Sequence, residues 1–326
     1  MTRLGGFDRV AQNLRYDGLW WRKFAYLGCV YGPEWWKRYS PPAFAAIIFA
    51  LNGRNRRGAI DNLARILDVP NRRQAAWGAL RMYTVFAHCF TETMEYYGPR
   101  PRPIRLDPPA HDALAEALRA GNGAVVVTGH FGNWDVAAKT LHEYGRPINV
   151  VMAREANATM HEYVRAAREH AGVRIIYSDS SVFSSLNMIR ALQRNEVVAI
   201  QLDRSAGAGG TRMVPFFGAP ASFPSGPFVL SRLAGAPLIP VFIPRLGTRH
   251  YAIRVHGPFR LSREARDSRA LAVVMREVVG AFETVVREFP TQWFQFAAFW
   301  PPVSVGRVSA TAATGEPPAE RIRGRG

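Results

Sequence analysis

The sequence predicts an α/β fold in which a central, largely parallel sheet is flanked by helices and preceded by an N-terminal helical region. With 326 residues, 48% of them hydrophobic, the chain can bury one large core or one core plus a smaller annex. The first hundred residues carry apolar side chains at helical spacing. From Gly123 onward, short apolar runs alternate with helical segments, as expected for a parallel sheet.

The N-terminal region, residues 1–103, is predicted to be helical and to associate with a membrane surface. Helical periodicity is clearest over 59–67 and 74–94. Between residues 20 and 39, aromatic side chains are interleaved with Arg and Lys, a mixture typical of the headgroup level of a bilayer. Packing of these aromatic rings in the protein core is the alternative.

No stretch reaches the ~18 uninterrupted apolar residues of a membrane span, and the nearest, 41–51, is too short. The N-terminus also lacks the pattern of a secretory signal. We therefore expect a peripheral or shallowly inserted protein on the cytoplasmic face of the inner membrane.

Residues 104–308 are predicted to form the α/β domain, and the Ala, Thr, Gly, Pro and Arg-rich segment 309–326 is predicted to be disordered. Strands are expected at 123–129, 148–152, 196–202 and 237–243, and helices at 135–143, 156–171, 182–193, 226–233 and 262–288. Strand and helix in turn indicate parallel pairing, with ligand groups beyond the carboxyl ends of the strands.

The charge balance indicates anionic partners. Forty-two Lys and Arg against 25 Asp and Glu give a net charge of +17, which attracts nucleic acid, an anionic bilayer or an acidic carrier protein. An Arg-rich composition without such a partner is the alternative. No helix-turn-helix, zinc-finger or RNP-like segment supports nucleic acid. The two cysteines, Cys29 and Cys89, exclude a disulfide framework and a Cys-rich zinc site.

The candidate catalytic motif is GHFGNWD, residues 129–135, which follows a predicted strand and opens a helix. His130 and Asp135 would stand about 140° apart on a regular helix, so only a turn can pair them, and Gly132 and Asn133 tolerate one. So paired, Asp135 would orient the imidazole and stabilise the imidazolium formed when His130 takes a proton. A histidine capping the helix beside a coincidental aspartate is the alternative.

The nucleophile would belong to the substrate, because the sequence has neither a GxSxG elbow nor a reactive cysteine arrangement. A hydroxyl or amine deprotonated by His130 would attack an ester or thioester, and backbone N–H groups at the helix start would stabilise the oxyanion. A thioester is already activated, so no metal or other cofactor is expected.

The motif resembles the HX4D/E signature of the lysophospholipid acyltransferase superfamily. Its surroundings resemble the bacterial lipid A biosynthesis acyltransferases, the late enzymes that add lauroyl or myristoyl chains. Similar blocks follow in the same order within about residues 58–300: Asn157 with Arg168 and Gly172, Leu202-Asp203, MVPFFGAPA at 213–221, GAPLIP at 235–240 and PTQWFQFAAFW at 290–300.

This resemblance implies a glycerol-phosphate acyltransferase-like fold and an O-acyltransferase of lipopolysaccharide biosynthesis. Such an enzyme moves a fatty acyl chain from acyl carrier protein or coenzyme A to a hydroxyl of a lipid A precursor. The resemblance implies His130 as the general base, Asp135 as its partner, and substrate binding by Asn157, Arg168 and Asp203. The acyl chain would contact an apolar wall, with ordinary core packing as the alternative for the same residues: Val214, Phe216, Phe217 and Phe223.

Two departures from the family pattern bear on the acceptor and the membrane. Asp135 stands where the family often has Glu, and this variant also resembles branches that acylate phosphatidylinositol mannosides, which are the alternative acceptors. The N-terminal membrane helix of enteric members is replaced by a segment, 18–37, that charged residues and a proline interrupt. A non-catalytic basic membrane-binding protein and a thioesterase are the other hypotheses.

Overall fold

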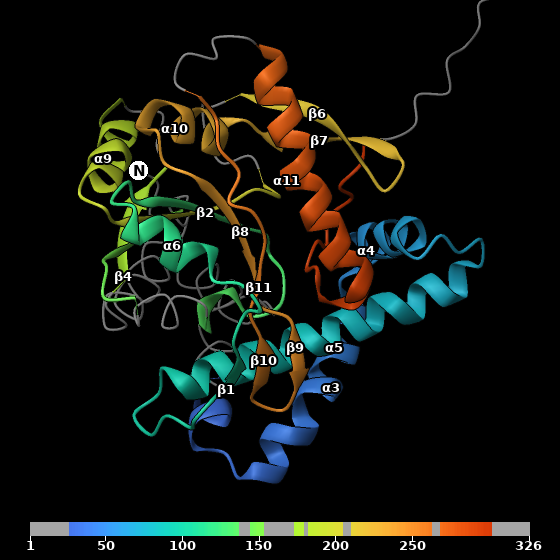
Figure 1. Ribbon diagram of the computed structural model, residues 1–326. Coiled ribbons are helices and arrows are strands. Elements are labelled where there is room, and N and C mark those ends of the chain that lie inside the picture. The colour runs from blue at the N-terminus through green and yellow to red at the C-terminus, as the bar shows by residue number, and fades with distance from the viewer. Residues whose placement is uncertain are drawn as a thin grey trace, which may run out of the picture.

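The computed structural model describes residues 26–136, 144–152, 173–178, 182–204, 210–262 and 268–301 (Figure 1). The helices are α3 (Glu34–Leu51), α4 (Gly53–Ile66), α5 (Arg72–Tyr96), α6 (Ala113–Arg119), α9 (Val182–Gln193), α10 (Gly226–Ala234), α11 (Ser268–Glu288) and the 3-10 turn η1 (Pro290–Gln292). The strands are β1 (Arg105–Asp107), β2 (Ala124–Thr128), β3 (Ile148–Met152), β4 (Val173–Tyr177), β5 (Val197–Gln201), β6 (Thr211–Phe216), β7 (Ala219–Pro224), β8 (Leu238–Phe242), β9 (Arg245–Gly247), β10 (His250–Ala252) and β11 (Arg254–Val255).

The central sheet has the strand order β11-β8-β2-β5-β3-β4, and every pairing within it is parallel except β11 with β8. The predicted α/β class with a largely parallel sheet is therefore confirmed. Strand β2 lies between β5 and β8, with Val126 opposite Ala199 on one side and Ile239 on the other. Its first four residues are buried, which explains their uninterrupted apolar character.

Helices α9, α10 and α11 pack against this sheet, and the β6–β7 hairpin lies beside α11 (Figure 1). The helices predicted at 182–193 and 226–233 are confirmed as α9 and α10. Helix α11 confirms the described part of the helix predicted at 262–288. The helix predicted at 156–171 and most of the one predicted at 135–143 lie outside the described residues.

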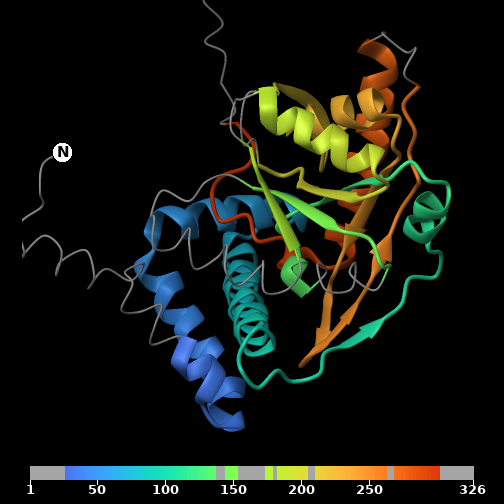
Figure 2. The same ribbon diagram turned by 90° about the vertical axis from the view of Figure 1, so that its left-hand side faces the viewer.

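Helices α3, α4 and α5 precede the sheet, and α3 packs along α5 (Figure 2). They share one hydrophobic core with the sheet, in which Leu63 and Met82 belong to the same cluster as Val125. At Gly58, an added Cβ would lie 2.5 Å from the backbone nitrogen of Ala298, so α4 approaches the C-terminal segment closely. The boundary expected at residue 103 stays a prediction, and the tail expected at 309–326 lies outside the described residues.

Among the described helices, none combines the length and the apolar character needed to cross a bilayer.

Candidate active site

The turn after β2 is tied by its backbone to two other parts of the chain. The carbonyl of His130 accepts from the N–H of Phe294 at 2.7 Å, and the N–H of Asn133 donates to the carbonyl of Ile243 at 3.0 Å. Gly132 has a φ of +57°, and a Cβ there would lie 1.9 Å from the same Ile243 oxygen. Only glycine fits this position, so the sequence fixes His130 at the carboxyl end of β2.

His130 is paired with Asp203, which lies two residues after the end of β5. The imidazole Nδ1 lies 2.9 Å from Oδ1 of Asp203, and the backbone N–H of His130 donates to Oδ2 at 2.8 Å. The indole Nε1–H of Trp293 also donates to Oδ2, at 2.9 Å. The Asp203 side chain is fully buried, whereas 13% of the His130 side chain is exposed. In this pair the carboxylate is buried from solvent and the imidazole is partly accessible.

Asp203 is held in its charged form. Burial alone raises the pKa of this carboxyl, but the hydrogen bonds and charge of His130 and the indole N–H of Trp293 outweigh burial and leave the pKa below its usual value. A carboxylate bonded to Nδ1 fixes the ring orientation and leaves Nε2 as the atom that can exchange a proton with a substrate. Among the described residues, Nε2 of His130 has no hydrogen-bond partner.

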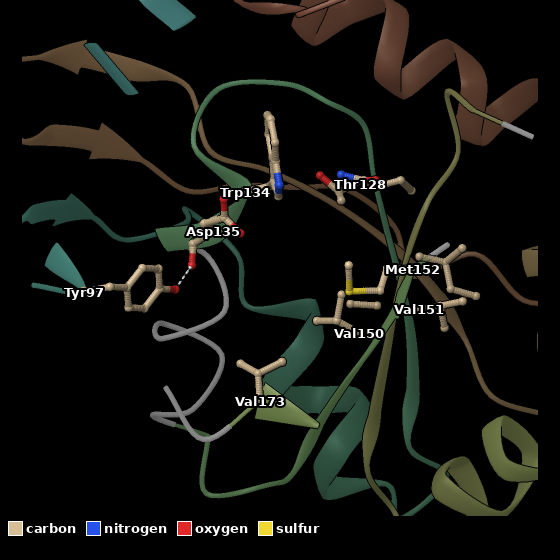
Figure 3. A pocket seen from close by; sticks show the side chains of 11 residues that line it. Tyr97, Thr128, Trp134, Asp135, Val150, Val151, Met152 and Val173 are labelled. Atoms are coloured by element: carbon tan, nitrogen blue, oxygen red, sulfur yellow. Dashed lines mark hydrogen bonds between the residues drawn. The ribbon is translucent and has the colours of Figure 1, made fainter. Parts of the chain in front are cut away.

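The predicted pairing of His130 with Asp135 is wrong in this structure, since Nδ1 is bonded to Asp203. Asp135 lies in the first turn of the helix that begins at Trp134, and its backbone carbonyl accepts from the hydroxyl of Tyr97 at 2.7 Å (Figure 3). The ring of Trp134 stands 5.3 Å from the imidazole of His130. Asp203 was expected to bind substrate, but its buried carboxylate is occupied by His130 and Trp293.

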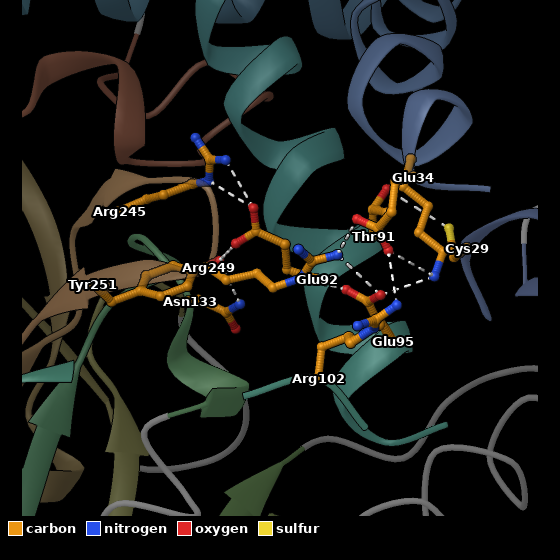
Figure 4. Close-up of polar contacts among 11 residues, drawn as sticks. Cys29, Glu34, Thr91, Glu92, Glu95, Arg102, Asn133, Arg245, Arg249 and Tyr251 are labelled. Carbon is orange, nitrogen blue, oxygen red and sulfur yellow. Dashed lines mark hydrogen bonds and ion pairs between the residues drawn. The ribbon is translucent and has the colours of Figure 1, made fainter. Parts of the chain in front are cut away.

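Asn133, between these residues, joins the turn to the N-terminal helices (Figure 4). Its side-chain oxygen accepts from the N–H of Val136, which caps the following helix, and from the hydroxyl of Thr93 in α5. Its amide donates to the hydroxyl of Tyr251 at 3.0 Å, and that hydroxyl donates to Glu92. Asn133 thus does more than tolerate a turn, because it fixes the turn against α5.

Glu92 and Arg245 form the charged end of the same network. Their side chains are 6% and 15% exposed and lie 2.7 Å apart. The pKa of the nearby Cys89 thiol is raised to about 12, mainly because the thiol is buried and to a smaller extent because Glu92 is negatively charged. This cysteine is therefore a neutral core residue. The polar network therefore supports the turn and supplies no second nucleophile.

A cavity of about 60 Å³ opens beside Trp134 and Asp135, at the carboxyl ends of β2, β3 and β5 (Figure 3). Most of its wall is apolar and comes from the sheet, including Val150, Met152 and Ile200. His130 is not among the lining residues, and Trp134 is the side chain that contacts both the cavity and the imidazole. An apolar cavity at this edge of the sheet suits part of a lipid substrate.

The residues predicted to form the acyl wall lie in the core. Phe216 and Phe223 are fully buried, and Phe216 packs against Phe282 of α11 and against Trp293. Phe217 is 6% exposed, and none of these three phenylalanines lines a cavity described here. These phenylalanines therefore pack as ordinary core residues, which was the alternative interpretation. Phe216 contacts Trp293, and Trp293 in turn donates a hydrogen bond to Asp203.

The remaining predicted site residues, Asn157 and Arg168, lie outside the described residues. Within the described ranges, no group of three or more His, Cys, Asp or Glu side chains is placed to hold a metal ion. Trp293 is the functional residue that local sequence reasoning missed, although it belongs to the resembling block at 290–300. A tryptophan following a helix gives no local sign of a bond to a carboxylate ninety residues earlier.

Fold and site together define an α/β protein with a histidine–carboxylate pair at the carboxyl ends of two neighbouring parallel strands. The chain belongs to the bacterial lipid A biosynthesis acyltransferase family, which it matches over residues 5–301.

Two curated relatives carry a more specific name. The chain is 26% identical over 190 residues to the phosphatidylinositol mannoside acyltransferase of Mycobacterium tuberculosis (strain ATCC 25618 / H37Rv), covering 58% of each chain. It is 25% identical over 190 residues to the protein of the same name from Mycolicibacterium smegmatis, covering 58% of this chain and 60% of the relative. The match therefore spans less than two thirds of the length of these relatives.

Proposed function

We propose that this protein is an acyltransferase that moves a fatty acyl group from a thioester donor to a hydroxyl of a glycolipid. The observation that carries the proposal is the His130–Asp203 pair, in a chain of this family, whose oriented imidazole lies against Trp134, a side chain of the apolar cavity wall. Binding of an anionic membrane alone would require no such pair. The charge of +17 suits an acidic carrier protein, coenzyme A and anionic lipid alike.

In the proposed reaction, Nε2 of His130 takes the proton of the acceptor hydroxyl as the oxygen attacks the thioester carbonyl. Asp203 stabilises the resulting imidazolium through Nδ1–H without itself becoming protonated. The tetrahedral intermediate then collapses, the C–S bond breaks, and His130 returns the proton to the departing thiolate. An ester and a free thiol are the products, and the proposed reaction needs a base rather than a bound cofactor.

For the acceptor, we propose a glycolipid of the phosphatidylinositol mannoside type, because the two relatives described above carry that name. The family description favours a lipid A precursor as the second candidate. Both acceptors reside in a membrane, so we also propose that the protein works at the surface of the inner membrane, on its cytoplasmic side. Acyl carrier protein and coenzyme A remain the two candidate donors.

The proposal is tested with purified protein, vesicles containing one candidate acceptor, and palmitoyl-coenzyme A or palmitoyl-acyl carrier protein. Thiol release and mass spectrometry of the lipids are measured together. We expect a lipid heavier by one acyl chain, formed in step with thiol, and His130→Ala should fold normally but lose transfer by orders of magnitude.

Thiol release at the same rate without acceptor would instead identify a thioesterase. A His130→Ala variant with near-normal transfer would refute the base. Vesicle binding with neither product would favour a non-catalytic membrane-binding protein.

A further inference from the structure

A second hollow, with a volume of about 270 Å³, lies between β6 and the N-terminal half of α11. Figure 1 shows the β6–β7 hairpin beside this part of α11. The wall combines apolar side chains with two arginines, Arg212 from the strand and Arg276 from the helix. The acyl-transfer steps described above do not use this hollow.

Arg212 comes from the face of β6 that meets α11, and Arg276 is an exposed residue next to the buried Met275 of α11. Side chains two residues apart lie on the same face of a strand, so Arg212 shares its face with Val214 and Phe216. The ring of Phe216 stacks on Phe282 of α11, with their centroids 5.6 Å apart. Met275 lies seven residues, about two turns, before Phe282 on the same side of the helix, and Arg276 is the next residue along it. The two guanidinium groups thus flank one hollow.

Neither arginine has an acidic partner in the part of the chain that the structure describes, and both are exposed. Arg245 and Arg249 are different, because each is bonded to a buried glutamate of α5. Two guanidinium groups that have no acidic partner among the described residues, at the edge of one hollow, favour a phosphate, whose oxygens accept their N–H groups in pairs. The apolar part of the wall, formed by Val214 and Met275, suits methyl and methylene groups.

The hollow is within reach of His130. Met275 lies seven residues before Phe282, which corresponds to roughly 10 Å along the helix. The ring of Phe282 packs against Gly129, where an added Cβ would lie 2.7 Å from it. A phosphopantetheine arm has thirteen bonds from phosphorus to sulfur, or roughly 15 Å when extended at the spacing of a polypeptide backbone. It is therefore long enough to join the two places.

We propose that this hollow binds the phosphate of the donor's phosphopantetheine arm, with Arg212 and Arg276 holding the phosphate oxygens. From this hollow the arm extends toward His130 and presents the thioester there. This inference rests on the proposed function. Acyl carrier protein and coenzyme A share the same arm, so the hollow serves a thioester of either source.

Binding is measured first, by calorimetry with phosphopantetheine and with pantetheine, which lacks the phosphate. We expect the wild-type protein to prefer the phosphorylated compound and Arg212→Ala/Arg276→Ala to lose that preference, at about tenfold in affinity for each arginine. Arg190→Ala is the matched control, because Arg190 is likewise exposed on a helix and lies outside the hollow. Circular dichroism checks that each variant is folded.

This measurement does not depend on turnover. If no acyl transfer is found but the phosphate preference disappears only in the double variant, the proposed function fails and the phosphate site stands. If the wild type shows no preference, or the double variant retains it, the phosphate site is overturned.

Steady-state kinetics then separate the donors from the acceptor. With palmitoyl-coenzyme A and with palmitoyl-acyl carrier protein, the double variant should raise the donor KM by about the same factor and change kcat little. An effect on one donor only would place a contact outside the shared arm and overturn the proposal. A raised KM for the glycolipid acceptor, with the donor KM unchanged, would assign the hollow to the acceptor phosphate and also overturn it.

Discussion

At the scale of single residues, the charge of Asp203 is the feature on which the proposed base catalysis depends. Asp203→Asn keeps the shape of the side chain but cannot stabilise an imidazolium at Nδ1, so we expect acyl transfer to fall by about 10²- to 10⁴-fold. Initial rates with saturating donor and acceptor measure the loss. Asp61→Asn is the control, because Asp61 forms an exposed ion pair with Arg72. A variant at Asp203 that retains normal turnover would contradict the assignment.

The same carboxylate makes stability depend on pH. Its pKa is lower in the folded protein than in the unfolded chain, so its contribution is complete above the ordinary aspartate value and is lost as the pH falls through the folded value. Urea unfolding of the wild type and Asp203→Asn should therefore show a gap in unfolding free energy that is largest near neutrality and narrows below about pH 4. A gap that stays constant from pH 7 to pH 3 would mean that Asp203 is not ionised in the fold.

Gly132 shapes the backbone of the turn that carries His130. Gly132→Ala places a Cβ against the carbonyl of Ile243 and forces alanine into a left-handed conformation, so we expect a loss of about 3 kcal/mol or more in unfolding free energy. Gly218→Ala is the control, because Gly218 also has a positive φ but an added Cβ meets no atom within 4 Å. Its cost should be about 1 kcal/mol. Equal losses, measured by chemical denaturation, would show that the contact with Ile243 is not the cause.

At the scale of elements, the link between α5 and strands β9 and β10 depends on a buried ion pair. Arg245→Met leaves Glu92 buried without its cation, so we expect a loss of about 3 kcal/mol in unfolding free energy. Arg254→Met should cost less than about 0.5 kcal/mol, since its partner Glu288 is exposed. Urea denaturation compares the two variants. Similar losses of unfolding free energy in the two variants would show that burial does not make the Arg245–Glu92 pair more important for stability than an exposed pair.

Whether a strand could be predicted from the sequence depends on its place in the sheet and on its length. Apolar runs predict β2, β3, β5 and β8 closely, because strands inside a parallel sheet that is covered by helices contain few polar residues. Strand β4 escapes that pattern because it lies at the sheet edge and carries Arg174, which is bonded to Glu196. The short strands β9, β10 and β11 are too brief to show a period.

The error over the partner of His130 has a similar origin. A local motif offers only the carboxylate five residues away. The pair with Asp203 exists because β5 lies next to β2, and this neighbour relation is set by crossovers and packing over seventy residues. Sequence reasoning named both His130 and Asp203 as candidate site residues, but their contact with each other could be seen only from the strand order.

At the scale of the whole molecule, charge and exposed apolar surface point to the same kind of environment. Helix α3 carries a ridge of large exposed side chains at four-residue spacing, formed by Trp35, Tyr39, Ile47 and Leu51. Each is more than half exposed, whereas the opposite side of the helix packs on α5. A net charge of +17 on the same chain would hold this ridge near anionic lipid.

Vesicle binding tests whether the α3 ridge enters a bilayer. Each large apolar side chain that leaves water contributes about 1.5–3 kcal/mol, so Trp35→Ser/Leu51→Ser should weaken binding to phosphatidylglycerol-containing vesicles at least tenfold in a sedimentation assay. Leu233→Ser on α10 alters an equally exposed side chain elsewhere and should leave binding unchanged. Added salt should weaken binding of all variants, because it screens the attraction to anionic lipid. Unchanged binding by the α3 variant, with the salt effect intact, would show that cationic side chains alone hold the protein at the membrane and that the α3 ridge faces something else.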